Sequence, residues 1–201
     1  MKWSANWNWK KLFFLLLSIN FIILFVIVFL IFWPMEEPTY PQKEFIEEDA
    51  GAEFTIRSGK ENLTELANAF LKKLPKEDNF TYMISLDDEV KLLGTIIAFG
   101  AEVPIQISFD PIVQENGDII LQSTNMSLGL LRLPQDRILK YVNDRIDTPE
   151  WITINPKEEH IYIAVTQMEL KSNFKVKVQQ FDLENDNITF RIKVPNKTLG
   201  L

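Results

Sequence analysis

The sequence predicts an α+β protein, in which an N-terminal transmembrane helix is followed by an antiparallel, curved sheet with two amphipathic helices. Three observations predict this. A run of 22 residues from Leu12 to Trp33 is almost entirely apolar. Beyond residue 50, most segments alternate apolar and polar residues, as strands with one buried face do. Two stretches, residues 60–74 and 134–146, instead repeat apolar residues at the spacing of an amphipathic helix.

The apolar run has the length and composition of an uncleaved anchor. Its residues, at a rise of about 1.5 Å each, reach about 33 Å, against a hydrocarbon core of about 30 Å. Nineteen of residues 12–32 are Leu, Ile, Phe or Val, which favour insertion strongly enough to tolerate Ser18 and Asn20. A cleaved signal peptide has a shorter apolar core and then small residues. This run ends in Phe32 and Trp33, so we expect it to remain in the mature protein.

Charged and aromatic residues at the two ends of the run predict its orientation. Lys10 and Lys11 precede it, and Glu36 and Glu37 follow it. Basic residues stay on the cytoplasmic side, so the N-terminus is expected in the cytoplasm and the C-terminal domain outside the cell membrane. Trp33 fits the outer membrane interface. The expected partner of this segment is the lipid bilayer.

Asn20 and Tyr40 each allow a further interpretation. Tyr40 fits the outer interface beside the anchor. Asn20 allows two interpretations. We favour the first, in which a strongly apolar helix simply tolerates one amide. In the second, the amide hydrogen-bonds to the helix of a membrane protein partner.

Composition divides the chain into four parts: a cytoplasmic N-terminus at 1–11, the transmembrane helix at 12–33, an acidic linker at 34–50, and an extracytoplasmic α+β domain at 51–201. The linker holds three prolines and six acids, which stiffen and extend it. The whole chain has a net charge of −7, and residues 1–33 carry three lysines and no acid, so the remaining residues carry −10. An acidic domain argues against nucleic acid as a partner. With no cysteine, disulfides, thiolate metal sites and a lipoprotein anchor are excluded.

Within the domain, the sequence predicts seven to nine strands and two helices. The first helix carries an apolar stripe that we expect to face the core, and Pro75 ends it. Asn116-Gly117 between two apolar runs is a strong hairpin signal. A second hairpin is expected across residues 184–187. Residues 166–173 are ambiguous. The expected strands are 52–57, 80–86, 90–99, 103–113, 118–127, 151–155, 160–165, 174–183 and 187–194.

Groups that could perform catalysis or bind a metal are few. His160 is the sole histidine, and it follows Glu158 and Glu159. It is expected to be an exposed turn residue, although an acid or base paired with a glutamate remains the alternative. The acids at 87–89 favour a solvated hairpin turn over a Ca²⁺ site, because they lack the spaced ligands of a calcium loop. We therefore expect no catalytic residue, no metal ligand, no cofactor and no enzymatic activity.

One strand has apolar residues on both faces, which indicates that both faces are covered. It lies at residues 90–99, and a leucine-rich loop follows at 128–133. One interpretation is that a helix simply covers the strand. The other is a groove for a lipid or another apolar ligand, with the loop as its lip. The residues that would line this groove are Leu93, Ile97, Phe99, Leu128, Leu130 and Leu131.

Two segments resemble the YpmS-like proteins of Gram-positive bacteria. The first, NWKKLFFLLLSIN, leads into the bulky apolar helix and Pro34, and the second is LGLLRLPQDRILKYV at 128–142. The resemblance covers nearly the whole chain, and it implies a bacterial single-pass membrane protein with its domain at the cell surface. No functional residue carries over from it. The pattern of curved strands with two helices is also distantly similar to lipid-cradling envelope domains, by fold analogy alone.

Two functions are compatible with these features. The first is a membrane-anchored extracytoplasmic binding module that holds a lipid or another apolar envelope molecule. The second is a non-catalytic interaction subunit or scaffold of a cell-envelope complex, for which the anchor and Asn20 are the motivating features.

Overall fold

A computed structural model of the chain describes residues 9–31, 40, 51–73, 80–98, 101–145, 148–168, 170 and 174–196. The chain forms two compact units, Met1–Glu36 and Glu37–Leu201. The first contains α1 (Trp9–Ile31), and the second contains the strands and the other helices.

Helix α1 confirms the predicted N-terminal helix and begins three residues before the apolar run. It is long and apolar enough to cross a membrane, as a membrane anchor or a signal sequence would be. Lys10 and Lys11 form part of its first turn. Trp33 lies outside the described residues. The Asn20 amide donates a hydrogen bond of 2.9 Å to the Leu16 carbonyl one turn earlier, so the helix itself satisfies part of this polar group.

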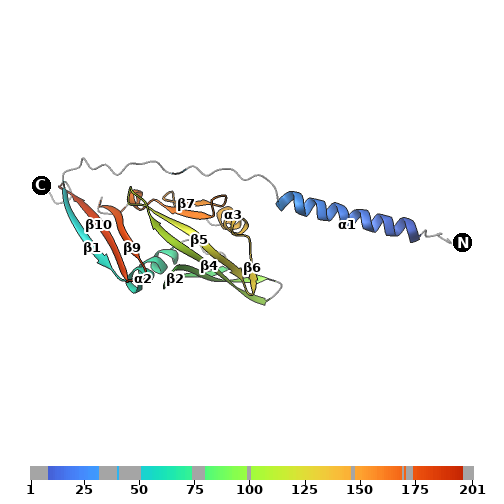
Figure 1. Ribbon diagram of the computed structural model, residues 1–201, viewed down its shortest axis with the longest axis horizontal. Helices are drawn as coiled ribbons and strands as arrows, with labels where there is room; N and C mark the ends of the chain where they lie inside the picture. The colour runs from blue at the N-terminus through green and yellow to red at the C-terminus, as the bar shows by residue number, and fades with distance from the viewer. Residues whose placement is uncertain are drawn as a thin grey trace. The chain divides into compact units, whose positions relative to one another are not determined.

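The larger sheet of the domain has seven strands, all paired antiparallel (Figure 1). Its order is β2-β3-β4-β5-β8-β7, and the short β6 pairs with β5. A bulge between Ser108 and Phe109 interrupts the register of β4 with β5, and such bulges bend a strand. The strands are β2 (Phe80–Leu86), β3 (Val90–Ala98), β4 (Ala101–Val113), β5 (Ile119–Leu128), β6 (Leu131–Arg132), β7 (Ile152–Asn155) and β8 (His160–Ile163).

The first strand and the last two form a separate sheet. Its order is β1-β10-β9, formed by β1 (Gly51–Ser58), β10 (Asn187–Pro195) and β9 (Lys175–Asp182). The pairing of β1 with β10 joins the two ends of the domain sequence. The α+β class is confirmed. The strands divide into two sheets, a division that alternation alone does not specify.

Helix α2 (Lys60–Leu71) lies along the edge of the larger sheet at β2. The Asn68 amide donates to the Ile84 carbonyl at 2.7 Å and accepts from the Ile84 amide at 2.9 Å. The Thr64 hydroxyl accepts from the Leu86 amide at 3.3 Å. Polar side chains of the helix thus satisfy backbone groups that an edge strand leaves unpaired. The predicted apolar stripe is only partly a core face, because Leu66 is 66% exposed.

The main core lies between the larger sheet, helix α3 (Gln135–Arg145) and the three-stranded sheet. Leu139 of α3 and Ile188 of β10 are fully buried in it. The residues of β3 with even numbers face this core, as Val90 and Leu92 show. A second cluster joins Ile119, Val178 and Val165, the last in the short 3₁₀-helix η1 (Val165–Gln167).

Gly117 connects the two sheets, and no other residue would fit in its place. It has a φ of +92°, and an added Cβ would lie 2.4 Å from the Lys177 Cβ. Its carbonyl accepts a hydrogen bond of 2.8 Å from the Val178 amide of β9. The Gly117 amide bonds to the Gln114 carbonyl, which closes the tight turn between β4 and β5. The Asn-Gly hairpin signal is therefore confirmed.

Candidate functional site

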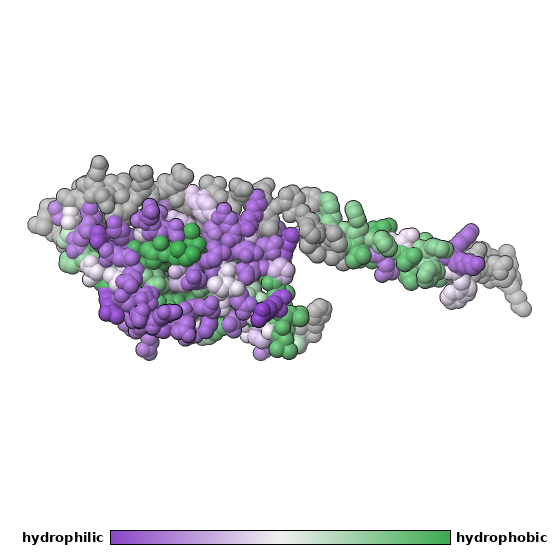
Figure 2. All heavy atoms as spheres, in the orientation of Figure 1, coloured by the Kyte–Doolittle hydropathy of each residue, from purple (hydrophilic) through white to green (hydrophobic). Residues whose placement is uncertain are grey.

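The turn between β5 and β6 presents two leucines to solvent. Leu130 is completely exposed and Leu131 is 65% exposed. Green, apolar surface gathers at the lower right end of the domain in Figure 2, where β6 lies in Figure 1. We call the segment Leu128–Leu131 the leucine turn. It contains the least buried leucine among the residues that the structure describes.

The backbone of the leucine turn is held in place by hydrogen bonds. Gly129 adopts a φ of +58°, which favours glycine, and its amide donates to the Pro104 carbonyl at 2.7 Å. Leu131 pairs with Leu128 across the ladder of β6 with β5. The Leu133 amide donates to the Met126 carbonyl at 3.1 Å. An ordered turn thus presents the two exposed leucines. A ligand that binds them would not have to order a flexible loop, so that entropy cost of binding is avoided.

The residues predicted to line a groove do not all share one surface. Leu93 pairs with Met83 on one side and Gln106 on the other, on the face of the sheet turned away from the core. Leu128 pairs with Ile105, which packs on the core side. Leu93 and Leu128 therefore lie on opposite faces. Ile97 lies in β3 opposite Glu102, and Phe99 lies outside the described residues.

His160 is buried, so the expectation of an exposed turn residue is wrong. Its side chain is 7% exposed, and its Nδ1 lies 3.6 Å from a carboxylate oxygen of Glu158. Its Nε2 lies 3.1 Å from the hydroxyl of Tyr40. The tyrosine ring stacks on the imidazole, with the two ring centroids 6.1 Å apart. Asn155, also buried, donates to both the Tyr40 hydroxyl and the Glu158 carboxylate. The side chains of Tyr40, Asn155, Glu158 and His160 form what we call the histidine cluster.

Burial determines the charge of His160. Desolvation lowers the pKa of His160 below its usual value, although the nearby Glu158 carboxylate opposes this effect. The imidazole is therefore neutral near pH 7. Both of its nitrogens face groups of the domain itself. The arrangement can attach Tyr40 to the β7–β8 turn, and it does not direct a nitrogen toward a substrate.

Asp118 forms a second buried polar centre, which ties the β4–β5 turn to η1. It is 1% exposed, and its carboxylate accepts hydrogen bonds from the amide and hydroxyl of Thr166, both at 2.9 Å. Tyr162 and Asn116 donate to the other carboxylate oxygen. Burial and the bond to Asp118 raise the pKa of Tyr162 to about 12, so its hydroxyl remains a donor. With its oxygens satisfied in this way, Asp118 is a structural residue.

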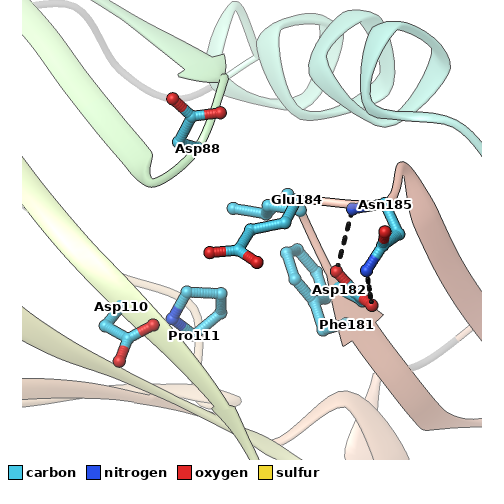
Figure 3. Close-up of a pocket in the computed structure, with 8 residues that line it drawn as sticks. Asp88, Asp110, Pro111, Phe181, Asp182, Glu184 and Asn185 are labelled. Atoms are coloured by element: carbon cyan, nitrogen blue, oxygen red, sulfur yellow. Dashed lines mark hydrogen bonds between the residues drawn. The ribbon is translucent and has the colours of Figure 1, made fainter.

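An acidic hollow of about 390 Å³ lies between β4 and the ends of the β2–β3 and β9–β10 hairpins (Figure 3). Figure 3 shows the carboxylates of Asp88, Asp110 and Glu184 around it, whereas Asp182 is bonded to Asn185. These bonds lower the pKa of Asp182, which stays ionised. The hollow suits a cationic group and disfavours an anionic one.

The three acids at 87–89 point to different partners. Asp87 accepts from Lys91 at 3.3 Å, and Glu89 accepts from the Thr124 hydroxyl at 3.0 Å. Asp88 lines the acidic hollow. Among the residues that the structure describes, no group of three or more His, Asp or Glu side chains is placed to hold a metal ion.

The histidine cluster is not predictable from the sequence, because Tyr40 is distant in the chain from the other members. Tyr40 precedes His160 by 120 residues and lies in the segment predicted to be a linker. Asn155, Glu158 and His160 are close in sequence, but their spacing also fits an exposed turn. An aromatic residue within an otherwise acidic, proline-rich segment was the available signal.

These observations define the class of the chain: an N-terminal apolar helix of membrane-spanning length joined to an α+β domain with a surface of exposed leucines. The chain belongs to the family described as "Uncharacterized protein conserved in bacteria (DUF2140)", whose model matches residues 7–194. It is 33% identical over 190 residues to the "Uncharacterized protein YpmS" of Bacillus subtilis (strain 168), covering 94% of this chain and 99% of that protein. The predicted YpmS-like family is thereby confirmed. No solved structure matches the chain.

Proposed function

We propose that the protein is a membrane-anchored extracytoplasmic binding module whose leucine turn engages the apolar part of a lipid. In this proposal α1 spans the cell membrane once, with its N-terminus in the cytoplasm and the domain outside. The observation that carries the proposal is the exposure of Leu130 and Leu131 on an ordered turn. Two adjacent leucines held in water are costly unless an apolar surface covers them.

The energetics favour a contact that depends on tethering. Burying a leucine side chain contributes about 1.5–3 kcal/mol, so two contribute about 3–6 kcal/mol before the costs of association. That energy alone would correspond to a dissociation constant between about 6 mM and about 0.04 mM, and the costs of association shift it toward the millimolar end or weaker. A short tether raises the effective concentration of the second site into the same millimolar range. A domain anchored by α1 would therefore keep its leucine turn bound to lipid, although the free domain would bind lipid only weakly.

We also propose that the domain acts by binding and not by catalysis. The sole imidazole of the chain is enclosed by Tyr40 and Glu158. The Asp118 carboxylate is fully engaged in holding Thr166, Tyr162 and Asn116. General acid–base chemistry needs a group within reach of a substrate proton, and these two buried groups are directed at the protein.

Matched single cysteines in the full chain test the proposal, because the chain has no native cysteine. An environment-sensitive fluorophore is attached to Leu131→Cys and, separately, to Leu66→Cys, in protein reconstituted into phosphatidylcholine vesicles. The two leucines have nearly equal exposure, 65% and 66%. We expect blue-shifted emission and quenching by nitroxide-labelled acyl chains at position 131 only. Equal emission and equal quenching at the two positions would refute the proposal.

A second function, a non-catalytic interaction subunit, rests on Asn20. Its amide donates to the Leu16 carbonyl, and the same side chain offers a further donor and an acceptor to a neighbouring helix. Crosslinking in intact cells would test this function. Loss of a crosslinked membrane protein on Asn20→Leu supports it, and an unchanged crosslinking pattern contradicts it.

A further inference from the structure

The outer edge of β1 is an open strand edge. Strand β1 is eight residues long and pairs on one side with β10, and no described segment pairs with its other side. Residues 53–57 are all exposed, including Phe54 at 53% and Ile56 at 46%. An exposed edge with apolar side chains is a template for another strand.

The open edge of β1 contrasts with the edge of the larger sheet at β2. There, Asn68 and Thr64 of α2 satisfy the backbone of Ile84 and Leu86. Along β1, the register with β10 runs without interruption from Gly51 to Ser58, so no bulge turns the edge away from an incoming strand. Within the described residues, the edge of β2 is therefore protected and the edge of β1 is available for pairing.

The sequence of β1 is complementary to itself. If two copies of β1 pair antiparallel about Thr55, Glu53 of each copy lies opposite Arg57 of the other. In the same register, Phe54 of each copy lies opposite Ile56 of the other. Opposite charges then meet on one face of the joined sheet and apolar side chains meet on the other. Both kinds of cross-strand pair stabilise a sheet.

We propose that the protein forms a symmetric dimer in which the β1 strands of two copies pair antiparallel about Thr55. The three-stranded sheets then join into one continuous sheet of order β9-β10-β1-β1-β10-β9. The same edge serves both copies, so the interface is closed by a two-fold axis and does not propagate into a fibre. The present contacts of the two charged residues are long and exposed. Glu53 lies 3.7 Å from Arg191, and Arg57 lies 3.5 Å from the Asp186 carbonyl.

Anchoring in one membrane constrains this arrangement. Tyr40 is held in the histidine cluster of its own domain, so six residues, 34–39, separate it from Trp33. A chain of this length spans up to about 25 Å when extended. The dimer therefore requires the two Tyr40 residues to lie within about that distance of one membrane surface.

Disulfide crosslinking of the full chain in its membrane tests the register. Residues directly opposite each other have Cα atoms about 4.5–5.5 Å apart, a separation that a disulfide can bridge. Mild oxidation of the Thr55→Cys variant is expected to give a covalent dimer. In the Glu53→Cys variant the two thiols would be four positions apart, about 13 Å, and we expect at least a tenfold lower yield. Equal yields from the two variants would overturn the proposal.

Charge reversal in the Thr55→Cys background provides the second test. Either Glu53→Arg or Arg57→Glu alone places like charges opposite each other and is expected to lower the dimer yield several-fold. The two reversals together restore opposite pairs and should restore the yield. A double variant that remains as poor as the single variants would contradict the proposed pairing. Both tests leave the leucine turn unchanged, so their outcome is independent of lipid binding.

Discussion

At the scale of single residues, burial decides what the ionisable groups of the domain do. Asp118 can be buried because four donor groups satisfy its carboxylate oxygens. His160 is buried and neutral because desolvation outweighs the attraction of Glu158. Both residues link segments that are distant in sequence, and neither is directed toward solvent.

The lowered pKa of His160 predicts a loss of stability in mild acid. Above pH 6.5 the imidazole is neutral in both the folded and the unfolded chain. Below pH 6.5 the unfolded chain binds a proton that the folded chain does not, until the pH falls through the lowered pKa. The free energy of unfolding should therefore decrease in this window, by at most about 1.4 kcal/mol per pH unit. Thermal unfolding of the full chain in detergent at pH 7.5 and pH 5.5 measures this decrease in stability.

His160→Gln supplies the control for the acid prediction, since glutamine keeps polar contacts and does not titrate. Other effects of acid, including weaker repulsion within the acidic domain, remain in this variant. The difference in stability between wild type and His160→Gln should shrink or reverse as the pH falls. A difference that is the same at both pH values would show that His160 does not contribute.

At the scale of elements, contacts from elsewhere in the chain complete the helices. The residue before α2 is Gly59, which offers no side chain to cap the helix. The Asp186 carboxylate, in the turn between β9 and β10, accepts a hydrogen bond of 2.6 Å from the Lys60 amide instead. An anion at a helix N-terminus also interacts favourably with the helix dipole. The small sheet thus supports the start of α2.

Substitutions at Asp186 separate capping from backbone strain, because this residue has a φ of +50°. Asp186→Gly keeps the backbone conformation and removes the cap, so we expect a loss of about 0.5–2 kcal/mol in unfolding free energy. Asp186→Ala adds a cost of about 1 kcal/mol for an alanine at positive φ. Asp186→Asn keeps both features and should cost least. Chemical denaturation orders the three variants, and an alanine variant as stable as asparagine would contradict this explanation.

At the scale of the whole molecule, the domain joins its two sheets through backbone contacts at Gly117 and through a shared apolar core. Gly117 lies against Lys177 and bonds to Val178, and a shared core continues on both sides of this contact. The pairing of β1 with β10 brings the ends of the domain sequence together.

Labelling of single cysteines tests how the chain crosses the membrane. With the N-terminus in the cytoplasm, Asn185→Cys, at an exposed turn, should react with a membrane-impermeant maleimide in intact cells. Ser4→Cys should react only after permeabilisation, because Lys10 and Lys11 retain their end of the helix inside. The opposite labelling pattern would reverse the proposed orientation. Release of the domain into the medium would identify α1 as a cleaved signal sequence.

The sequence by itself determined the elements that depend on local chemistry. The apolar composition of α1, the alternation of β2 and β10, and the Asn116-Gly117 turn each act over a few neighbouring residues, so they are visible in the chain alone. The exposed leucine turn was also within reach of the sequence. Its residues are adjacent, and Gly129 marks the turn.

The tertiary structure alone decided which elements meet. Whether a strand belongs to one sheet or the other depends on pairing between distant segments, and alternation is the same in both sheets. The stacking of Tyr40 on His160 spans 120 residues, and the cap of α2 by Asp186 spans 126. The burial of His160 and the placement of Leu93 and Leu128 on opposite faces of the sheet also follow from how these distant segments pack together. Such contacts are set by the packing of the whole core, which no short pattern in the sequence encodes.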